Sequence, residues 1–464
     1  MTDSGDTKIE LRDAWDDMMR SLQEARNAID EAEFMPPPAS ERNLAEGYRY
    51  LMGFVHSAVE RAFHSDPKQP QFRNALSTIN RATIDNPDAV YFYVPIDGRA
   101  SYMLQGQVGD TRHWRGEPAL SSASKAPHYL IFEASCGELA GDSGDLRELQ
   151  PGMKTQTGML DASNIEVDAD GSFSILLAPE RPGDYSGNFI STLKVVERPH
   201  PADPNLPPER YANYISGRQL FYDWEHEQAI HFEIEPLGDS SALAAPYSAD
   251  RAARELRRLG EIVRGQMHFW NAFWAIPMGV YGERPGTMPG MAFPRNAFNK
   301  INAASGATGG GMSTNLYAGG VFELAPDEAL IVEVTINLQP NYFGFQLANL
   351  WGESLEYANC TSSLNGFQTV ADADGVIRLV VAHQDPGVHN WLDTDDHREG
   401  FLSPRWAYSQ TPAPDNWPKI TANKVAFSQL RDHLPSTTAL VSKEQRQQQI
   451  ALRQRHVQRR FRAF

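Results

Sequence analysis

The first part of the chain places apolar residues every three or four positions, which predicts two amphipathic helices. The first helix must end at the run from Met35 to Pro38, because consecutive prolines cannot continue a helix. The second helix is expected from about Ser40 to His64. One face of the first helix carries Ile9, Leu11, Trp15, Met18, Leu22 and Ile29. One face of the second carries Leu44, Tyr48, Leu51, Val55, Val59 and Phe63.

A third helical pattern runs from about Ser248 to Phe273, with Ser248 or Asp250 as its N-cap. Its buried face is expected to hold Leu256, Leu259, Val263 and Trp270. The Gly- and Pro-rich stretch from Pro277 to Gly320 is interpreted as a long loop.

Elsewhere the pattern changes to short apolar runs typical of β-strands, beginning with Val90 to Val94. One signature occurs twice, at 168–192 and at 372–394. Each copy has Asp-Ala-Asp-Gly, an apolar run and a Pro-Gly pair, which predict a turn, a strand and a second turn. Leu130–Glu133 and Leu330–Glu333 form a further similar pair upstream. The repetition predicts two related β-domains in tandem.

The predicted fold class is mainly β with a helical N-terminus: two related jelly-roll-like β-sandwich domains, a linking helix and a C-terminal helix. The expected organisation is a helical region at 1–87, a β-domain at 88–243, the linking helix and loop at 244–314, a second β-domain at 315–440 and a basic helix or tail at 441–464. This Arg-rich tail is interpreted as a solvated helix. The alternatives are docking onto the protein itself or a sister subunit, or contact with an acidic partner or nucleic acid.

Composition narrows the class of protein. The formal charge of −17 argues against a general nucleic-acid binder. Two cysteines, Cys136 and Cys360, make a disulfide framework improbable, and no apolar run reaches the roughly 18 residues of a membrane span. We therefore expect a cytoplasmic protein without a membrane or nucleic-acid partner, for which a homo-oligomer is an open alternative.

The second signature, from Asp372 through Asn390-Trp391-Leu392 to Thr394, resembles the bacterial domain-of-unknown-function family 1214 over about 315–410. That family often follows a related one, family 1254. The resemblance includes an Arg in the closing strand, here Arg405. The family's Phe-Trp-Ser segment is replaced by Tyr342 to Gln346 and Asn349 to Trp351. The resemblance implies a jelly-roll-like β-sandwich and supplies no reaction.

The residues that differ between the two copies indicate where function can lie. Asn188 and Asn390, which both copies share, are expected to be structural. The second copy alone gains imidazoles and carboxylates, namely His383, Asp385, His389, Asp393, Asp395, Asp396 and His397. We expect His383 or His389 to act as a base, oriented by Asp393 or Asp395. An exposed polar loop is the plainer interpretation, and a divalent metal is possible but not favoured because the spacing fits no established metal motif.

A ligand site is expected from aromatic residues with polar neighbours. Its candidate members are Trp351, Asn349, Gln346, Trp391, Arg405 and His268, although Trp391 aligns with Phe189 and is also a core candidate. His231, Glu233 and Glu235 alternate along a strand and are interpreted as the wet face of an edge strand.

These residues suggest a cofactor-independent hydrolase or lyase acting on a small, partly hydrophobic molecule of sterol, terpenoid or aromatic type. The alternative is a non-catalytic β-sandwich protein that binds a ligand or saccharide or serves in assembly.

Overall fold

The computed structural model describes residues 4–31, 36–118, 124–137, 141–238, 246–279, 292–303 and 314–461. The chain forms two compact units. Unit 1 comprises Met1–Asn80, Ala89–Phe221 and His226–Phe273, and unit 2 comprises Arg81–Asp88, Tyr222–Glu225 and Trp274–Phe464. The stretch expected as a long loop, 277–320, lies partly outside the described residues.

The predicted helices are present as α1 (Ser4–Asn27), α2 (Glu41–Phe63) and α3 (Ala249–Ala275). The Ser40 hydroxyl accepts a bond from the Asn43 amide at 3.0 Å, and the Ser248 hydroxyl accepts one from the Arg251 amide at 3.2 Å. Both serines therefore cap their helices as polar N-cap residues do. In the described part of the chain, no helix combines the length and apolar character needed to cross a membrane.

The buried face of α2 is not the stripe that its sequence emphasises. Its buried apolar residues are Tyr50, Leu51, Phe54, Ala58 and Ala62. Within the predicted stripe only Leu51 is buried, whereas Tyr48 and Val59 are exposed. α2 is therefore apolar on two opposite sides, and periodicity alone does not say which one packs inward.

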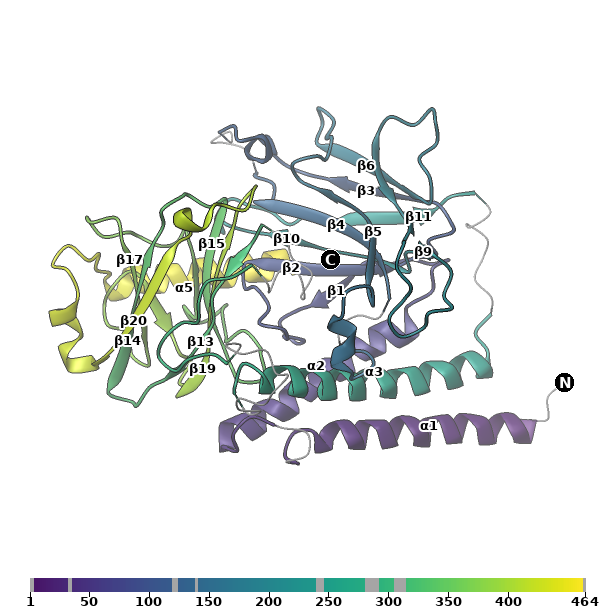
Figure 1. Ribbon diagram of the computed structural model, residues 1–464, viewed down its shortest axis with the longest axis horizontal. Helices are drawn as coiled ribbons and strands as arrows, with labels where there is room; N and C mark the ends of the chain where they lie inside the picture. The colour runs from purple at the N-terminus through teal and green to yellow at the C-terminus, as the bar shows by residue number, and fades with distance from the viewer. Residues whose placement is uncertain are drawn as a thin grey trace. The chain divides into compact units, whose positions relative to one another are not determined.

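Unit 1 contains two sheets that pack as a sandwich (Figure 1). The first has the order β1 (Arg73–Leu76), β2 (Ala89–Pro95), β10 (Tyr214–Leu220), β4 (Tyr129–Cys136) and β5 (Thr155–Asp161). The second has the order β11 (Phe232–Pro236), β3 (Tyr102–Gln107), β6 (Ser172–Ala178) and β7 (Asn188–Ser191). A separate hairpin pairs β8 (Leu193–Val195) with β9 (Glu209–Tyr211). Phe132 and Ile215 of the first sheet share one core with Leu104 and Ile175 of the second.

Unit 2 repeats this arrangement. Its first sheet has the order β12 (Leu316–Tyr317), β19 (Glu399–Ala407), β15 (Tyr342–Ala348) and β16 (Ser363–Asn365), and β13 (Gly320–Glu323) also pairs with β19. Its second sheet has the order β18 (Trp391–Asp393), β17 (Ile377–Ala382), β14 (Glu328–Thr335) and β20 (Lys419–Ala426). Phe345 and Leu402 of the first sheet share a core with Val332 and Leu379 of the second.

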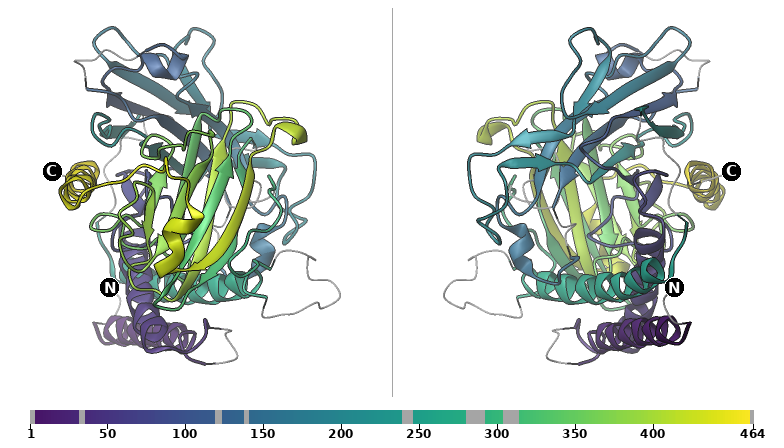
Figure 2. Two further views of the ribbon diagram at one scale, coloured as in Figure 1. Left: turned by 90° about the vertical axis from the view of Figure 1, so that its left-hand side faces the viewer. Right: turned by 90° about the vertical axis from the view of Figure 1, so that its right-hand side faces the viewer.

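Side chains on alternate positions of a strand face opposite sides of its sheet. In β14, Leu330 and Val332 therefore enter the sandwich core, while Ala329 and Ile331 belong to a second cluster with Leu430. Leu430 lies on the short helix η6 (Phe427–His433), seen in front of the unit 2 strands in Figure 2, left. Other short helices are η2 (Arg112–Arg115), η3 (Leu146–Leu149) and η5 (Pro414–Asn416). The C-terminal helix is α5 (Lys443–Arg460).

Eight strands of unit 1 have counterparts in unit 2 in the same chain order. The strands β2, β3, β4, β5, β6, β7, β10 and β11 correspond to β13 through β20, because both sheets have matching neighbours. In each unit the two strands of the signature, β6–β7 and β17–β18, form the parallel pair. The prediction of a mainly β fold with two related sandwiches, a helical N-terminus and a C-terminal helix is confirmed.

The shared residues of the signature have the same contacts in both copies. The Asn188 side chain accepts the Glu166 amide and donates to the carbonyls of Glu166 and Ser174, at 2.8 to 3.1 Å. Asn390 makes the equivalent three bonds to Val370 and Arg378, at 2.7 to 2.9 Å. The structural role expected for this Asn pair is confirmed.

The expected equivalence of Leu130–Glu133 and Leu330–Glu333 is wrong. The first segment lies in β4, whose counterpart is β15, and the second lies in β14, whose counterpart is β3. Both segments are central strands with neighbours on both sides, so they share an apolar strand pattern without sharing a place in the fold.

Candidate functional site

The two copies differ most in the link that follows the signature. In unit 2, residues 394–398 connect β18 directly to β19. In unit 1, residues 192–213 connect β7 to β10 and include the β8–β9 hairpin. Both candidate sites described below lie next to this link.

The short link of unit 2 is a tight turn with two left-handed residues, Asp395 (φ 48°) and Asp396 (φ 60°). Aspartate tolerates this conformation better than most residues because its side chain can bond the local backbone. The carboxylate of Asp393 accepts the amide of Asp395 at 2.9 Å, and Nδ1 of buried His397 donates to the Thr394 carbonyl at 2.9 Å. The turn therefore positions Asp393 and Asp395 next to each other.

Asp393 also contacts the thiol of Cys360. Burial is the main cause that raises the pKa of the Asp393 carboxyl, and the bond from Cys360 opposes this rise. Burial and the nearby carboxylates of Asp393 and Asp395 raise the pKa of the Cys360 thiol to about 12. A thiol in this state is a poor nucleophile, so the chemical interest of the pair rests on the carboxyl group.

The two histidines expected as bases are held by other partners. Nε2 of His383 lies 3.3 Å from the Leu324 carbonyl, and Nδ1 lies 2.7 Å from the Thr394 hydroxyl. A carbonyl only accepts, so Nε2 donates, and in a neutral ring Nδ1 accepts from Thr394. Nε2 of His389 donates to the Gln368 carbonyl at 3.0 Å. Each imidazole therefore joins two segments of unit 2 by hydrogen bonds. Neither histidine is bonded to Asp393 or Asp395, so the four expected catalytic residues do not form one hydrogen-bonded group.

Two expected ligand-binding residues, Gln346 and Arg405, bind a segment of the chain itself. Gln346 Nε2 donates to the Asp85 carbonyl at 2.6 Å. The Arg405 guanidinium donates to the Ile84 carbonyl at 3.0 Å and to the Gln346 side chain at 2.8 Å. This segment, residues 81–88, belongs to unit 2 and covers the outer face of its first sheet. The surface expected to hold a ligand is therefore filled.

The other four expected ligand-binding residues have separate places. Asn349 bonds the Glu353 carboxylate at 2.8 Å and shapes the loop that contains buried Trp351. Trp391 is buried, donates to the Ala382 carbonyl at 3.0 Å and lies under the Arg446 guanidinium. His268 belongs to unit 1, where it lies beside Gly144.

The 81–88 segment inserts two buried carboxylates into unit 2. Asp85 accepts both the amide and the hydroxyl of Ser354, at 2.9 and 2.7 Å. Asp88 accepts the Tyr342 hydroxyl at 2.5 Å, Asn365 at 3.0 Å and Trp224 at 2.8 Å. Burial is the first cause that raises the pKa of each carboxyl.

The basic C-terminal helix docks on the same region, so the expectation of a solvated helix is wrong. Arg453 and Arg460 are both buried, and Arg453 donates to the carbonyls of Tyr357 and Ser363 at 2.7 and 3.0 Å. Both guanidinium groups lie over the Trp224 ring, and His456 stacks on it at 5.0 Å. These arginines are stabilised by carbonyls, an indole face and the nearby Asp88 charge.

Among the described residues, no group of His, Cys, Asp and Glu side chains has the arrangement to hold a metal ion. His231, Glu233 and Glu235 are exposed beside and along the edge strand β11, as the wet-face interpretation predicts.

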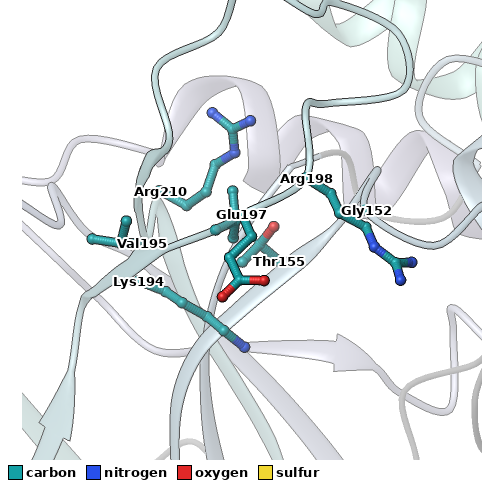
Figure 3. Close-up of a pocket in the computed structure, with 8 residues that line it drawn as sticks. Gly152, Thr155, Lys194, Val195, Glu197, Arg198 and Arg210 are labelled. Atoms are coloured by element: carbon teal, nitrogen blue, oxygen red, sulfur yellow. The ribbon is translucent and has the colours of Figure 1, made fainter.

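The long link of unit 1 borders a pocket of about 380 Å³. Thr155 of β5, the segment 194–198, and Arg210 of β9 line it together with Gly152. Lys194, Arg198 and Arg210 contribute three cations, and Glu197 contributes one carboxylate. Figure 3 shows the Glu197 carboxylate and the Thr155 hydroxyl lying between the three cationic head groups. A local excess of positive charge thus occurs on a chain whose net charge is −17.

Side-chain bonds to backbone carbonyls hold this link in place. The Arg210 side chain is buried and donates to the Pro207 carbonyl, and Lys194 Nζ donates to the Gln156 carbonyl at 3.3 Å. The differences between the two copies pointed to the second copy as the place of function and did not predict this pocket. A usable signal was the length of the link after Thr192, which greatly exceeds the link after Thr394.

Comparisons with known proteins name no activity. No family model and no curated protein matches the chain. A solved structure of an uncharacterized protein from Burkholderia cenocepacia is 26% identical, covers 89% of this chain and 97% of its own, and has a TM-score of 0.69. The VPA0106 protein from Vibrio parahaemolyticus is 9% identical over 87% of this chain and 100% of its own, with a TM-score of 0.36. The first likeness covers nearly all of both chains.

Proposed function

We propose that this protein binds a small organic anion with an apolar portion, in the pocket of unit 1 beside β8. The observation that carries the proposal is the set of three cationic side chains, Lys194, Arg198 and Arg210, around one pocket. Guanidinium groups offer paired donors that match a carboxylate. Val195 and Val196 supply apolar contacts for the rest of the ligand.

The size and charge of the pocket support this class of ligand. A volume of about 380 Å³ lies within the usual range for small-molecule sites. The local cations attract an anion at short range even though the chain as a whole repels it. The apolar portion agrees with the sterol, terpenoid or aromatic class expected from the sequence, which the proposal narrows to their carboxylates.

The experiment is a melting-temperature screen over aromatic, terpenoid and sterol carboxylates, followed by titration calorimetry with the compound that stabilises most. The double variant Lys194→Ala/Arg198→Ala should raise the Kd at least about tenfold, a loss of roughly 1.4 kcal/mol. Both side chains are exposed, so this variant should keep its fold. Arg210 is not replaced, because its bond to Pro207 also holds the link.

Arg455→Ala is the control, since Arg455 is an exposed arginine on α5 outside the pocket. It should bind the same compound with unchanged affinity. Equal affinity of the double variant and the wild type, or a screen in which no carboxylate stabilises the protein, would reject the proposal.

A hydrolase or lyase site in unit 2 is the second candidate, favoured by the raised pKa of Asp393. A carboxyl group whose pKa is raised by burial is suited to general-acid chemistry. Product analysis of the stabilising compounds tests it: turnover that disappears in Asp393→Asn supports an enzyme, and turnover that persists assigns the chemistry elsewhere.

We also propose that residues 315–410 belong to the domain-of-unknown-function family 1214 that they resemble. A cytoplasmic location is also proposed, and it agrees with the two cysteines, Cys136 and Cys360, being free thiols.

A further inference from the structure

The outward side of α2 carries an apolar stripe along the whole helix. Tyr48 is 45% exposed, Met52 59% and Val59 41%. Leu44, Val55 and Phe63 are half-buried on the same side, so the stripe repeats at spacings of three and four residues. That spacing is the pattern of a helix face that packs against another surface. The opposite side of α2 is already buried in unit 1 through Tyr50, Leu51 and Phe54.

An exposed apolar side chain also lies on a neighbouring loop. Ile79 is 58% exposed, and its carbonyl lies 3.0 Å from the position that a Cβ on Gly53 would take. Gly53 therefore lets this loop approach the middle of α2.

We infer that this stripe is the interface of a homodimer, in which α2 packs antiparallel to α2 of a second copy. A two-fold axis near Met52 would place Tyr48 against Val55 of the second copy, and Leu44 against Val59. An interface of this kind is self-complementary, as closed two-fold dimers require.

The charges beside the stripe fit a second copy of the chain. Arg42 and Glu60 are eighteen residues apart, which is about five helical turns, so they lie on the same side of α2. In the antiparallel arrangement, Arg42 of each copy faces Glu60 of the other. Both intermolecular contacts therefore join opposite charges, whereas a parallel arrangement would place like charges together.

The area of the stripe indicates a weak dimer. Three side chains that are about half exposed and three that are half-buried offer less apolar area than the roughly 800 Å² per partner of a standard-sized interface. We expect a dimer that forms at micromolar concentration and not an obligate one.

The experiment measures the mass of the full chain in solution by sedimentation equilibrium at tens of micromolar. The expected species has twice the chain mass of 51.7 kDa. Met52→Glu should give a monomer. Met159→Glu is the matched control, since Met159 is 47% exposed on β5 and outside the stripe, and it should remain a dimer.

Charge reversal tests the antiparallel geometry. Arg42→Glu or Glu60→Arg alone should raise the dimer dissociation constant roughly tenfold, because two symmetry-related contacts become like-charged. The double variant should restore dimerisation. Circular dichroism and melting temperature check that each variant is folded, since Arg42 also contacts buried Glu46 within its own chain.

A monomeric wild type overturns the inference, as does a dimer that persists in Met52→Glu. Binding of the monomer to vesicles of phosphatidylcholine, lost in Met52→Glu, would also overturn it and assign the stripe to a lipid surface. A dimer in which the two reversals do not compensate would overturn the antiparallel arrangement.

Discussion

Thr83 and Ile84 hold two consecutive left-handed conformations, with φ of 64° and 50°. A β-branched residue in this region is strained, because its side chain crowds the backbone. The Ile84 amide donates to the Gly352 carbonyl at 2.7 Å, and its carbonyl accepts from Arg405 at 3.0 Å. These bonds fix the turn that positions Asp85 beside Ser354.

Replacing Thr83 by glycine should stabilise unit 2 by about 1 kcal/mol, because glycine adopts a positive φ without steric cost and Thr83 is exposed. Urea unfolding measures the change. Gly375→Ala is the matched control: its φ is 80° and a new Cβ would meet open space, so backbone strain alone should destabilise it by about 1 kcal/mol. If Thr83→Gly destabilises the protein as Gly375→Ala does, the backbone at Thr83 is not strained.

Single residues were predictable where the repeat provided a comparison. Asn188 and Asn390 occur in both copies, and their structural role follows from that alone. The roles of His383 and His389 did not follow, because their partners, Leu324 and Gln368, are 59 and 21 residues away in sequence. A residue that differs between copies can serve binding, catalysis or local packing, and only the tertiary contacts distinguish these roles.

At the level of elements, α5 shows that a basic helix can be buried and need not face solvent. Ser442 and Gln445 form a capping box that starts the helix, and this signal is local. Docking depends instead on Trp224, which lies more than 200 residues earlier and stacks on His456. The sequence therefore predicts the helix and does not predict where its arginines lie. The same limit applies to α2, whose ends were predictable and whose buried face was not.

The buried His456 should make stability depend on pH. Burial first, and then the charges of Arg460, Arg459 and Arg453, lower its pKa from the ordinary 6.5 to about 2. The folded protein therefore keeps His456 neutral, while the unfolded chain binds a proton below pH 6.5. Stability from this group is complete above pH 6.5 and falls by about 1.4 kcal/mol per pH unit as the pH drops further.

The comparison is between the wild type and His456→Gln by urea unfolding at pH 7 and pH 5. The variant lacks the titration, so the free-energy difference between the two proteins should shift in favour of the variant at pH 5. The raised pKa values of Asp85 and Asp88 act in the opposite direction and are common to both proteins. A difference that stays constant with pH would contradict the assignment.

At the scale of the whole chain, the two units are related in fold and interleaved in sequence. The repeat predicted two β-sandwiches, and the matching order of eight strands confirms them. Nothing in the local pattern indicates that 81–88 and 222–225 belong to unit 2, because neither segment forms a strand of its sheets. Their assignment depends on side-chain bonds such as those of Asp85 and Asp88.

This interleaving predicts that unit 2 cannot be isolated as a continuous fragment. A chain of residues 274–464 lacks Asp85, Asp88 and Trp224, and therefore leaves Ser354, Tyr342 and Arg453 without partners that they have in the full chain. Burying polar groups without their partners costs about 1 to 3 kcal/mol for each neutral group and more for a charge. The loss should remove most of the stability of a domain of this size.

We therefore expect fragment 274–464 to unfold at much lower urea concentration than the full chain, or to lack a cooperative transition, as followed by circular dichroism and tryptophan fluorescence. Co-expression with fragment 1–273, which contains both missing segments, should restore the transition. A fragment that unfolds cooperatively at the urea concentration of the full chain would mean that the two inserted segments do not stabilise unit 2. The buried carboxylates of Asp85 and Asp88 argue against that outcome, because taking a charged group out of water costs free energy that stabilising contacts must offset.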